Sequence, residues 1–234
     1  MRKRYLMFLC GTMLVIVFAV SSPVHSEFIG NIQGGTDFPQ GAISFADAVV
    51  NYSPGMVASS PTEPHRGDFN ALGLPNYVGV NSCSSQGNCT FVSLGDGGSI
   101  TLRFIDNKLT GSGNNNLDLW VFEVGPDIED TFVAISKDNI NWTNVGKVFG
   151  STAGIDIDAF GFGTADIFAF IRLTDDTDEG GQSGGTVGAD IDAVGAISTI
   201  STPSTEVPEP TTMLLLGSGL LGLAGYGRRK FFKK

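Results

Sequence analysis

The central part of the chain combines short apolar stretches with turn-forming loops, and this pattern constrains its fold more than any other feature. Between residues 27 and 198 no stretch has helical periodicity, whereas short alternating or apolar stretches recur between loops rich in Gly, Asn and Asp. Alternation with a period of two marks a strand with one buried face. The strands we expect lie at residues 91–94, 99–105, 117–124, 131–136, 141–148, 167–173 and 191–197. Seven short strands predict an all-β fold, an antiparallel, jelly-roll-like β-sandwich.

Two of these stretches carry further information. Residues 117–124 are apolar on both faces apart from Asp118 and Glu123, which predicts a central strand in which Trp120 packs into the core. Residues 106–116 hold several Gly and Asn residues and are expected to form a long polar loop.

The N-terminus has the organisation of a secretory signal peptide. Three basic residues at positions 2–4 precede an apolar run at 5–20, and Val24 and Ser26 stand at −3 and −1 of a cleavage site before Glu27. We therefore expect residues 1–26 to be removed on export and residues 27–198 to form the single folded domain.

The charge of the body is strongly acidic. Residues 27–205 contain six basic and 22 acidic residues, a formal charge of −16. A surface of this sign repels nucleic acid, whose binding depends on neutralising phosphates, so no nucleic-acid partner is expected. Clustered carboxylates suit calcium, which prefers oxygen ligands, and calcium is the only cofactor expected.

The cysteines of the body predict a disulfide. Cys83 and Cys89 flank a Ser/Gly/Asn-rich turn, which in an oxidising compartment is typical of a small disulfide-closed loop. A metal site would need further Cys or His ligands, and His65 is the only histidine of the body.

The sequence does not favour an enzyme. It contains no phosphate-binding loop and no His-Glu-x-x-His motif. Carboxylate pairs suited to glycoside hydrolysis are abundant in any acidic chain, so a polysaccharide hydrolase remains the third alternative.

The last 28 residues form a tripartite tail after a Ser/Thr/Pro linker at 199–206. Its motif is Val207, Pro208, Glu209 and Pro210, and its basic cluster is Arg228, Arg229 and Lys230. The apolar helix expected between them is shorter than the ~20 residues that cross a bilayer, and the basic residues would hold the C-terminus on the cytoplasmic side. A plain tail anchor is the alternative.

In its order and spacing, this tail at 207–234 resembles the PEP-CTERM sorting signal of exported bacterial proteins. The resemblance implies recognition by an exosortase-type membrane protease. It also implies a transient stay in the inner membrane through the C-terminal helix, followed by transfer to the cell surface or extracellular matrix.

A second resemblance concerns the body. Ser136, Asp138, Asn139 and Trp142 are spaced like the Ser-x-Asp-Gly-x-x-Trp hairpin of discoidin-like and galactose-binding-like jelly rolls. Asn replaces the usual Gly, and Asn also adopts positive φ. Trp142 is a candidate to stack on a sugar ring, with packing across the hairpin as the alternative.

The resemblance also implies a structural cation near the terminal strands, where Asp47, Asp190 and Asp192 stand at matching places. The acidic loop 175–179 is the alternative calcium site. Together these observations predict a non-catalytic, exported envelope or matrix protein. A calcium-assisted carbohydrate-binding module, with extracellular polysaccharide as its partner, is the second hypothesis.

Overall fold

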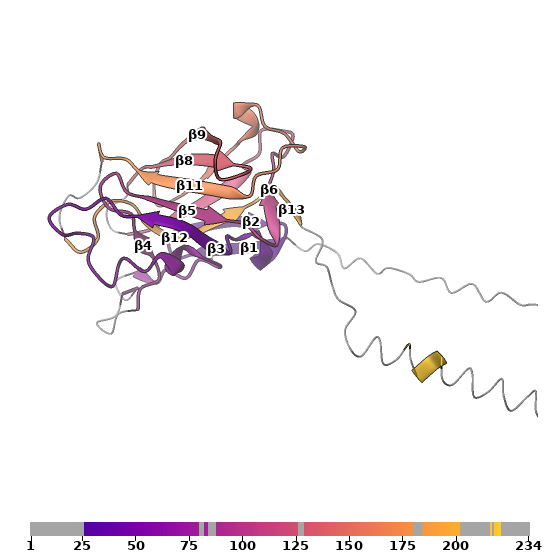
Figure 1. Cartoon of the computed structure of the whole chain (residues 1–234), viewed down its shortest axis with the longest axis horizontal. Coiled ribbons are helices and arrows are strands. Elements are labelled where there is room, and N and C mark those ends of the chain that lie inside the picture. Colours follow the sequence, from indigo (N-terminus) through magenta and orange to yellow (C-terminus); the bar gives the residue numbers. More distant parts are fainter. Residues whose placement is uncertain are drawn as a thin grey trace, which may run out of the picture.

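The computed structural model describes residues 26–79, 82–83, 88–125, 129–179, 184–201, 216 and 218–220. They form a β-sandwich of two antiparallel sheets, with three short 3-10 helices (Figure 1). These helices are η1 (Gly41–Ser44), η2 (Asp68–Ala71) and η4 (Asp158–Phe160). The predicted all-β antiparallel fold class is confirmed.

The two sheets have five and four strands. The larger one follows the order β3 (Ala48–Ser53), β5 (Ser99–Arg103), β11 (Phe170–Asp175), β8 (Thr131–Ser136) and β9 (Trp142–Val148). The smaller one follows the order β10 (Thr152–Ile155), β7 (Leu119–Glu123), β12 (Asp190–Ala196) and β4 (Val92–Ser93). Two further ribbons pair β1 (Glu27–Asn31) with β2 (Gly34–Phe38) and β6 (Asn107–Leu109) with β13 (Thr199–Ser201).

The main core lies between the two sheets. Along β11, buried and half-buried residues alternate, so that Ile171 and Leu173 point inward. They join a buried cluster that also contains Leu119 and Val121 of β7 and Ile191 of β12. This is the packing that a period-two pattern produces when one face of each sheet is covered by the other.

The smaller sheet is covered on both of its faces. Every residue of β12 is buried, because the N-terminal part of the chain packs on the outer side of β7 and β12. The rings of Phe38 and Phe45 lie 4.7 Å apart, and both are within 6.3 Å of the ring of Phe122. Trp120 packs against this second cluster, as expected for a core residue. The central position predicted for 117–124 is therefore confirmed.

Several strands lie where the sequence predicted none. β1, β2 and β3 precede residue 91, and β6 lies inside the polar loop predicted at 106–116. β13 occupies the first three residues of the expected linker, where Thr199 pairs with Leu109. β1 and β2 pair with each other in a short hairpin, whereas β3, β6 and β13 pair with residues that are distant in the sequence. Pairing by backbone hydrogen bonds alone leaves no apolar alternation in the sequence.

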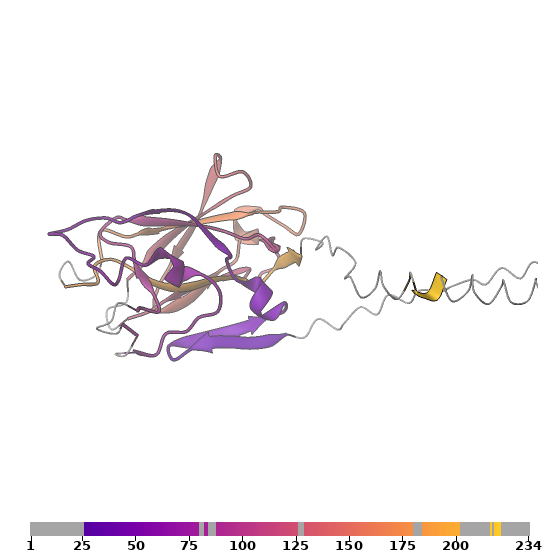
Figure 2. The same ribbon diagram turned by 60° about the horizontal axis from the view of Figure 1, so that its bottom comes forward.

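The described domain has two distinct ends. β6 and β13 lie at one end, and β4 and the beginning of β12 lie toward the other (Figure 1). Figure 2 shows the same separation from a second direction, with the loops of residues 54–79 far from β13. β13, the last strand of the domain, therefore lies on the side opposite these loops.

Most of the two predicted terminal signals lies outside the described residues, including the sorting-motif residues 207–210 and the basic cluster 228–230. Leu216 and residues 218–220 are described, and they are helical. Within the described parts of the chain, no helix is both long enough and apolar enough to cross a membrane.

Candidate functional site

A pocket with a volume of about 510 Å³ opens among the loops near β4 and the beginning of β12. Its lining combines aromatic and polar side chains, among them Gln33, His65, Tyr77, Ser82, Phe91 and Asp190. Pockets of this size with a few converging polar groups are the usual binding sites for small ligands.

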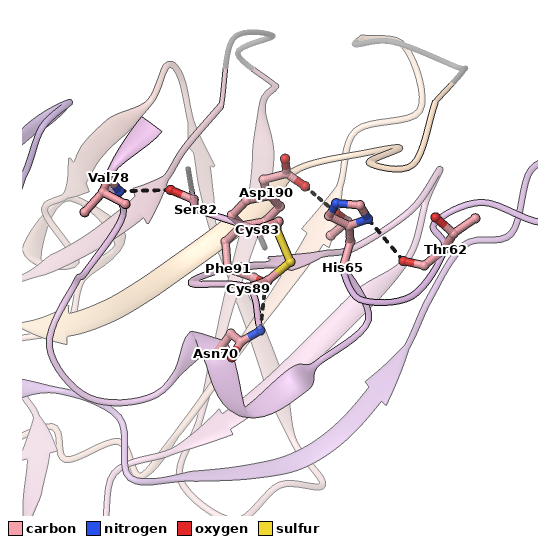
Figure 3. The surroundings of a disulfide bond; sticks show 10 residues. Thr62, His65, Asn70, Val78, Ser82, Cys83, Cys89, Phe91 and Asp190 are labelled. Atoms are coloured by element: carbon pink, nitrogen blue, oxygen red, sulfur yellow. Dashed lines mark hydrogen bonds between the residues drawn. A yellow bond between two sulfur atoms is a disulfide. The ribbon is translucent and has the colours of Figure 1, made fainter. Parts of the chain in front are cut away.

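Aromatic rings form one wall of the pocket. The imidazole of His65 stacks on Phe91 with ring centroids 5.9 Å apart, and Tyr77 meets the same ring edge-on at 6.0 Å. His65 Nδ1 lies 3.2 Å from the carbonyl oxygen of Thr62, and the amide of Asn70 donates to the carbonyl of Phe91 (Figure 3). The contact with Thr62 helps to orient the imidazole of His65, and the bond from Asn70 holds the backbone of Phe91.

The predicted disulfide is confirmed, and it belongs to this pocket. Cys83 is bonded to Cys89 beside Phe91, and Cys83 lines the cavity (Figure 3). The sulfur atoms and a His65 nitrogen lie close enough to share a metal ion. Because both sulfur atoms are used in the disulfide, neither is a thiolate, and the group is unsuited to zinc.

Asp190 supplies the acidic side of the pocket. Its Oδ1 accepts a hydrogen bond from the hydroxyl of Ser93 in β4, and its carboxylate is directed toward the imidazole of His65 (Figure 3). Burial raises the pKa of the nearby Tyr77 hydroxyl, and the carboxylates of Asp190 and Glu123 add to this shift. The tyrosine therefore stays a neutral hydrogen-bonding group.

Glu123 lies in β7, where its side chain is completely buried. Burial is the largest cause that raises the pKa of Glu123 to about 10, and the Asp190 carboxylate adds to it. At neutral pH Glu123 is therefore a neutral carboxylic acid close to the charged wall of the pocket. Sequence reasoning recognised it only as a polar exception in an apolar strand.

The three aspartates predicted to hold calcium make separate contacts. Asp192 accepts hydrogen bonds from the side chain of Asn31 and from the backbone amides of Asn76 and Tyr77, all within 3.1 Å. Asp47 instead accepts hydrogen bonds from the backbone amides of Ile105 and Asp106, which follow β5.

None of the carboxylate groups close enough to share an ion in the described part of the chain contains Asp47, Asp190 or Asp192. The structure therefore does not assemble these three residues into one site. It brings Asp190 to the pocket instead.

The acidic loop expected as the alternative calcium site is paired with the side chain of a lysine on β9. Asp130, Asp176 and Glu179 are close enough to share an ion, but the Lys147 Nζ lies 2.7 Å from Asp130 and 3.8 Å from Glu179. It also forms an ion pair with Asp176. Hydrogen bonds from this ammonium lower the pKa of Asp176, and those to Asp130 and Asp176 raise the pKa of Lys147.

Sequence reasoning did not connect Lys147 with this loop. Lys147 stands opposite Phe132 in the pairing of β9 with β8, and this pairing brings it beside Asp130. The only signal for it in the sequence is the hairpin that joins the two strands.

Trp142 begins β9 after the predicted hairpin turn. Asn139 has a φ of 63°, and the Asp138 carboxylate accepts hydrogen bonds from the backbone amides of Ile140 and Asn141. The Arg172 guanidinium lies 4.0 Å from the centroid of the Trp142 ring, so one ring face is covered by a cation–π contact. Stacking of a sugar on Trp142 remains a prediction.

A comparison with family models supplies the evidence for function that the geometry does not. Residues 206–230 match the model described as the PEP-CTERM protein-sorting motif. A comparison with curated proteins gave no match.

The match defines the class first: this is a protein sorted through its C-terminal tail and exported through the membrane to the cell surface. More specifically, the chain carries a PEP-CTERM motif, and such motifs are recognised by exosortase. The matched segment contains the predicted residues Val207 to Pro210 and Arg228 to Lys230. The discoidin-like character of the body stays a prediction.

Proposed function

We propose that this chain is a non-catalytic, exported envelope or matrix protein. Its C-terminal helix holds it in the inner membrane until an exosortase processes the tail, and the β-sandwich then remains at the cell surface or enters the extracellular matrix. The PEP-CTERM motif at residues 206–230 is the observation that carries this proposal.

The arrangement of the domain supports the proposal. β13, the last strand of the sandwich, lies at one end of the domain (Figures 1 and 2). The pocket opens among the loops near β4 and the beginning of β12, toward the other end. A tail anchored in the membrane would therefore present the pocket away from it. The charge of −16 on residues 27–205 also suits a soluble extracellular domain.

Intact-mass measurement of the protein recovered from the envelope and the medium tests the processing step. In cells that possess the sorting protease, we expect chains that lack the residues following Pro210. A matched chain with Pro208 and Pro210 replaced by Ala should retain its tail. Full-length chains ending at Lys234 in both cases would favour a plain membrane anchor.

A carbohydrate-binding module is the second candidate, and the composition of the pocket favours it. Aromatic faces from His65, Tyr77 and Phe91 stand beside the polar groups of Gln33 and Asp190. Sugar rings bind through apolar contact with aromatic faces combined with hydrogen bonds to carboxylate and amide groups.

Binding to a glycan array, with and without a chelator, tests this candidate. His65→Ala removes a half-buried ring at the pocket, and Trp142→Ala removes the other proposed stacking residue. Loss of binding in only one variant identifies the surface used, whereas no binding by the unaltered protein would contradict the carbohydrate hypothesis. Turnover of a polysaccharide panel would instead show a hydrolase.

A further inference from the structure

A second group of three carboxylates lies outside the pocket and outside both calcium sites expected from the sequence. Asp118, Asp156 and Asp158 each place an oxygen within 4.8 Å of the others. Asp118 directly precedes β7, Asp156 directly follows β10, and Asp158 begins η4. Because β10 pairs antiparallel with β7, with Ile155 opposite Leu119, the residues at the ends of the two strands lie side by side.

Asp118 is a fully buried carboxylate in which one of the two side-chain oxygens has no close hydrogen bond among the described residues. Burial raises the pKa of this carboxyl, although the side chains of Ser112 and Ser198 lie near enough to lower it in part. Its backbone amide donates to Ile155, and its carbonyl accepts from Ile197 and Ser198. The side-chain Oδ2 accepts from the amide of Ile157 at 2.9 Å. Oδ1 is buried and has no hydrogen-bond partner among the described residues. A buried oxygen without a hydrogen bond raises the free energy of the folded chain, so a ligand bound to this oxygen would stabilise the fold.

The other two carboxylates are held in place by the neighbouring loop. Asp158 accepts hydrogen bonds from the amide of Ser112 at 2.8 Å, from its hydroxyl at 3.1 Å and from the amide of Gly113 at 3.1 Å. Asp156 Oδ1 accepts from the amide of Asp158. A side chain at Gly111 would approach Asp158 Oδ2 to 2.9 Å, so the loop packs closely on the cluster. The cluster is thus oriented before any ion binds.

A comparison with the other acidic triad shows what this one lacks. There, the Lys147 ammonium lies among Asp130, Asp176 and Glu179. No basic side chain of the described residues forms an ion pair with Asp118, Asp156 or Asp158.

We propose that Asp118, Asp156 and Asp158 bind one calcium ion. Three carboxylates, with the Ser112 hydroxyl beside Asp158, are the hard oxygen ligands that calcium prefers, and calcium tolerates irregular geometry better than magnesium does. The ion would give the buried Oδ1 of Asp118 a partner and would connect β7, β10 and the loop at 111–113. This site is independent of the pocket and of the sorting tail.

Calcium titration of the full-length protein in a mild nonionic detergent, after chelator treatment, tests the proposal. We expect one ion per chain and a rise in the unfolding midpoint, because an ion that binds only the folded chain stabilises it. Asp156→Asn should weaken calcium binding at least tenfold. The asparagine keeps the acceptor for the Asp158 amide, so the fold is retained.

Glu179→Gln is the matched control, since it removes one carboxylate from the triad that contains Lys147. Calcium binding that is lost in this variant, or that is unchanged by Asp156→Asn, would overturn the assignment, as would an unaltered chain that takes up no calcium. Hydrogen exchange of the unaltered chain gives an independent readout. Calcium should slow exchange in the loop at 111–113 and leave residues 175–179 unaffected.

Discussion

The buried carboxyl group of Glu123 should make the stability of this protein depend on pH. The side chain is 0% exposed, and burial, with the carboxylates of Asp190 and Glu129, raises its pKa from 4.5 to about 10. In the unfolded chain the group titrates near its ordinary value. Between these two pKa values the folded protein holds a proton that the unfolded chain releases.

The sign and size of the effect follow from this difference in bound protons. The neutral carboxyl group makes its full contribution to the free energy of unfolding below pH 4.5. This contribution is lost as the pH rises toward the pKa of the group in the folded protein. The free energy of unfolding therefore falls by about 1.4 kcal/mol per pH unit, or about 4 kcal/mol between pH 5 and pH 8. Because the folded pKa lies above this interval, its exact value hardly changes the result.

Glu123→Gln removes the titration with little change in shape. The free energy of unfolding of the variant, minus that of the unaltered protein, should increase by about 4 kcal/mol from pH 5 to pH 8. Burial also raises the pKa of Asp118, Asp175 and Asp192, but these groups are common to both proteins and cancel in the difference. A constant cost of burying the amide shifts the difference equally at every pH.

Urea denaturation of both proteins at several pH values measures this difference. Glu27→Gln, at an exposed position in β1, controls for the loss of one negative charge. If the difference between the Glu123 variant and the unaltered protein stays constant, or decreases with pH, the carboxyl group is not held neutral by burial and the reasoning fails.

Two further predictions concern the disulfide and the Lys147 cluster. Replacing Cys83 and Cys89 by Ser should lower the free energy of unfolding by about 2 kcal/mol, the loop-closure value for so short a loop; urea titrations that coincide would contradict this. Lys147→Met leaves the buried Asp130 and Asp176 without a counter-charge, so the melting midpoint should fall at pH 7. The fall should diminish at acid pH, as Asp176, whose pKa the ammonium lowers, takes up a proton. Lys137→Met removes an exposed pair with Asp166 and should change little at either pH.

Apolar patterning predicted the strands that build the main core. The strand expected at 131–136 corresponds to β8 (Thr131–Ser136), and the central strand expected at 117–124 corresponds to β7 (Leu119–Glu123). Both strands bury one face against the opposite sheet, and this burial produces the apolar pattern by which they were predicted. β1 and β2 contain three glycines between them and pair mainly with each other, so no comparable pattern marks them.

The positions of the charged groups were harder to predict, because strand pairing decides them. Asp190 and Asp192 alternate along β12, so a regular strand would place them on one face, but the register of β12 against β7 shifts between Ile191 and Ala193. Asp47 lies beside the end of β5, whereas Asp190 lies beside β4. Residues that seemed to converge are thus distributed over three local hydrogen-bond networks.

The two carboxylate clusters show why the acidic composition predicted that the domain holds a cation but could not predict where that cation lies. In both, an antiparallel pairing brings carboxylates from distant parts of the sequence together: β11 with β8 for Asp130 and Asp176, and β10 with β7 for Asp118 and Asp156. The pairing of β9 with β8 also places the Lys147 ammonium among the carboxylates of the first cluster. The second cluster instead contains a buried carboxylate oxygen without a partner in the described chain. Two clusters of three carboxylates each are therefore expected to respond to different changes. Adding calcium should stabilise the protein through Asp118, whereas removing Lys147 should destabilise it through Asp130.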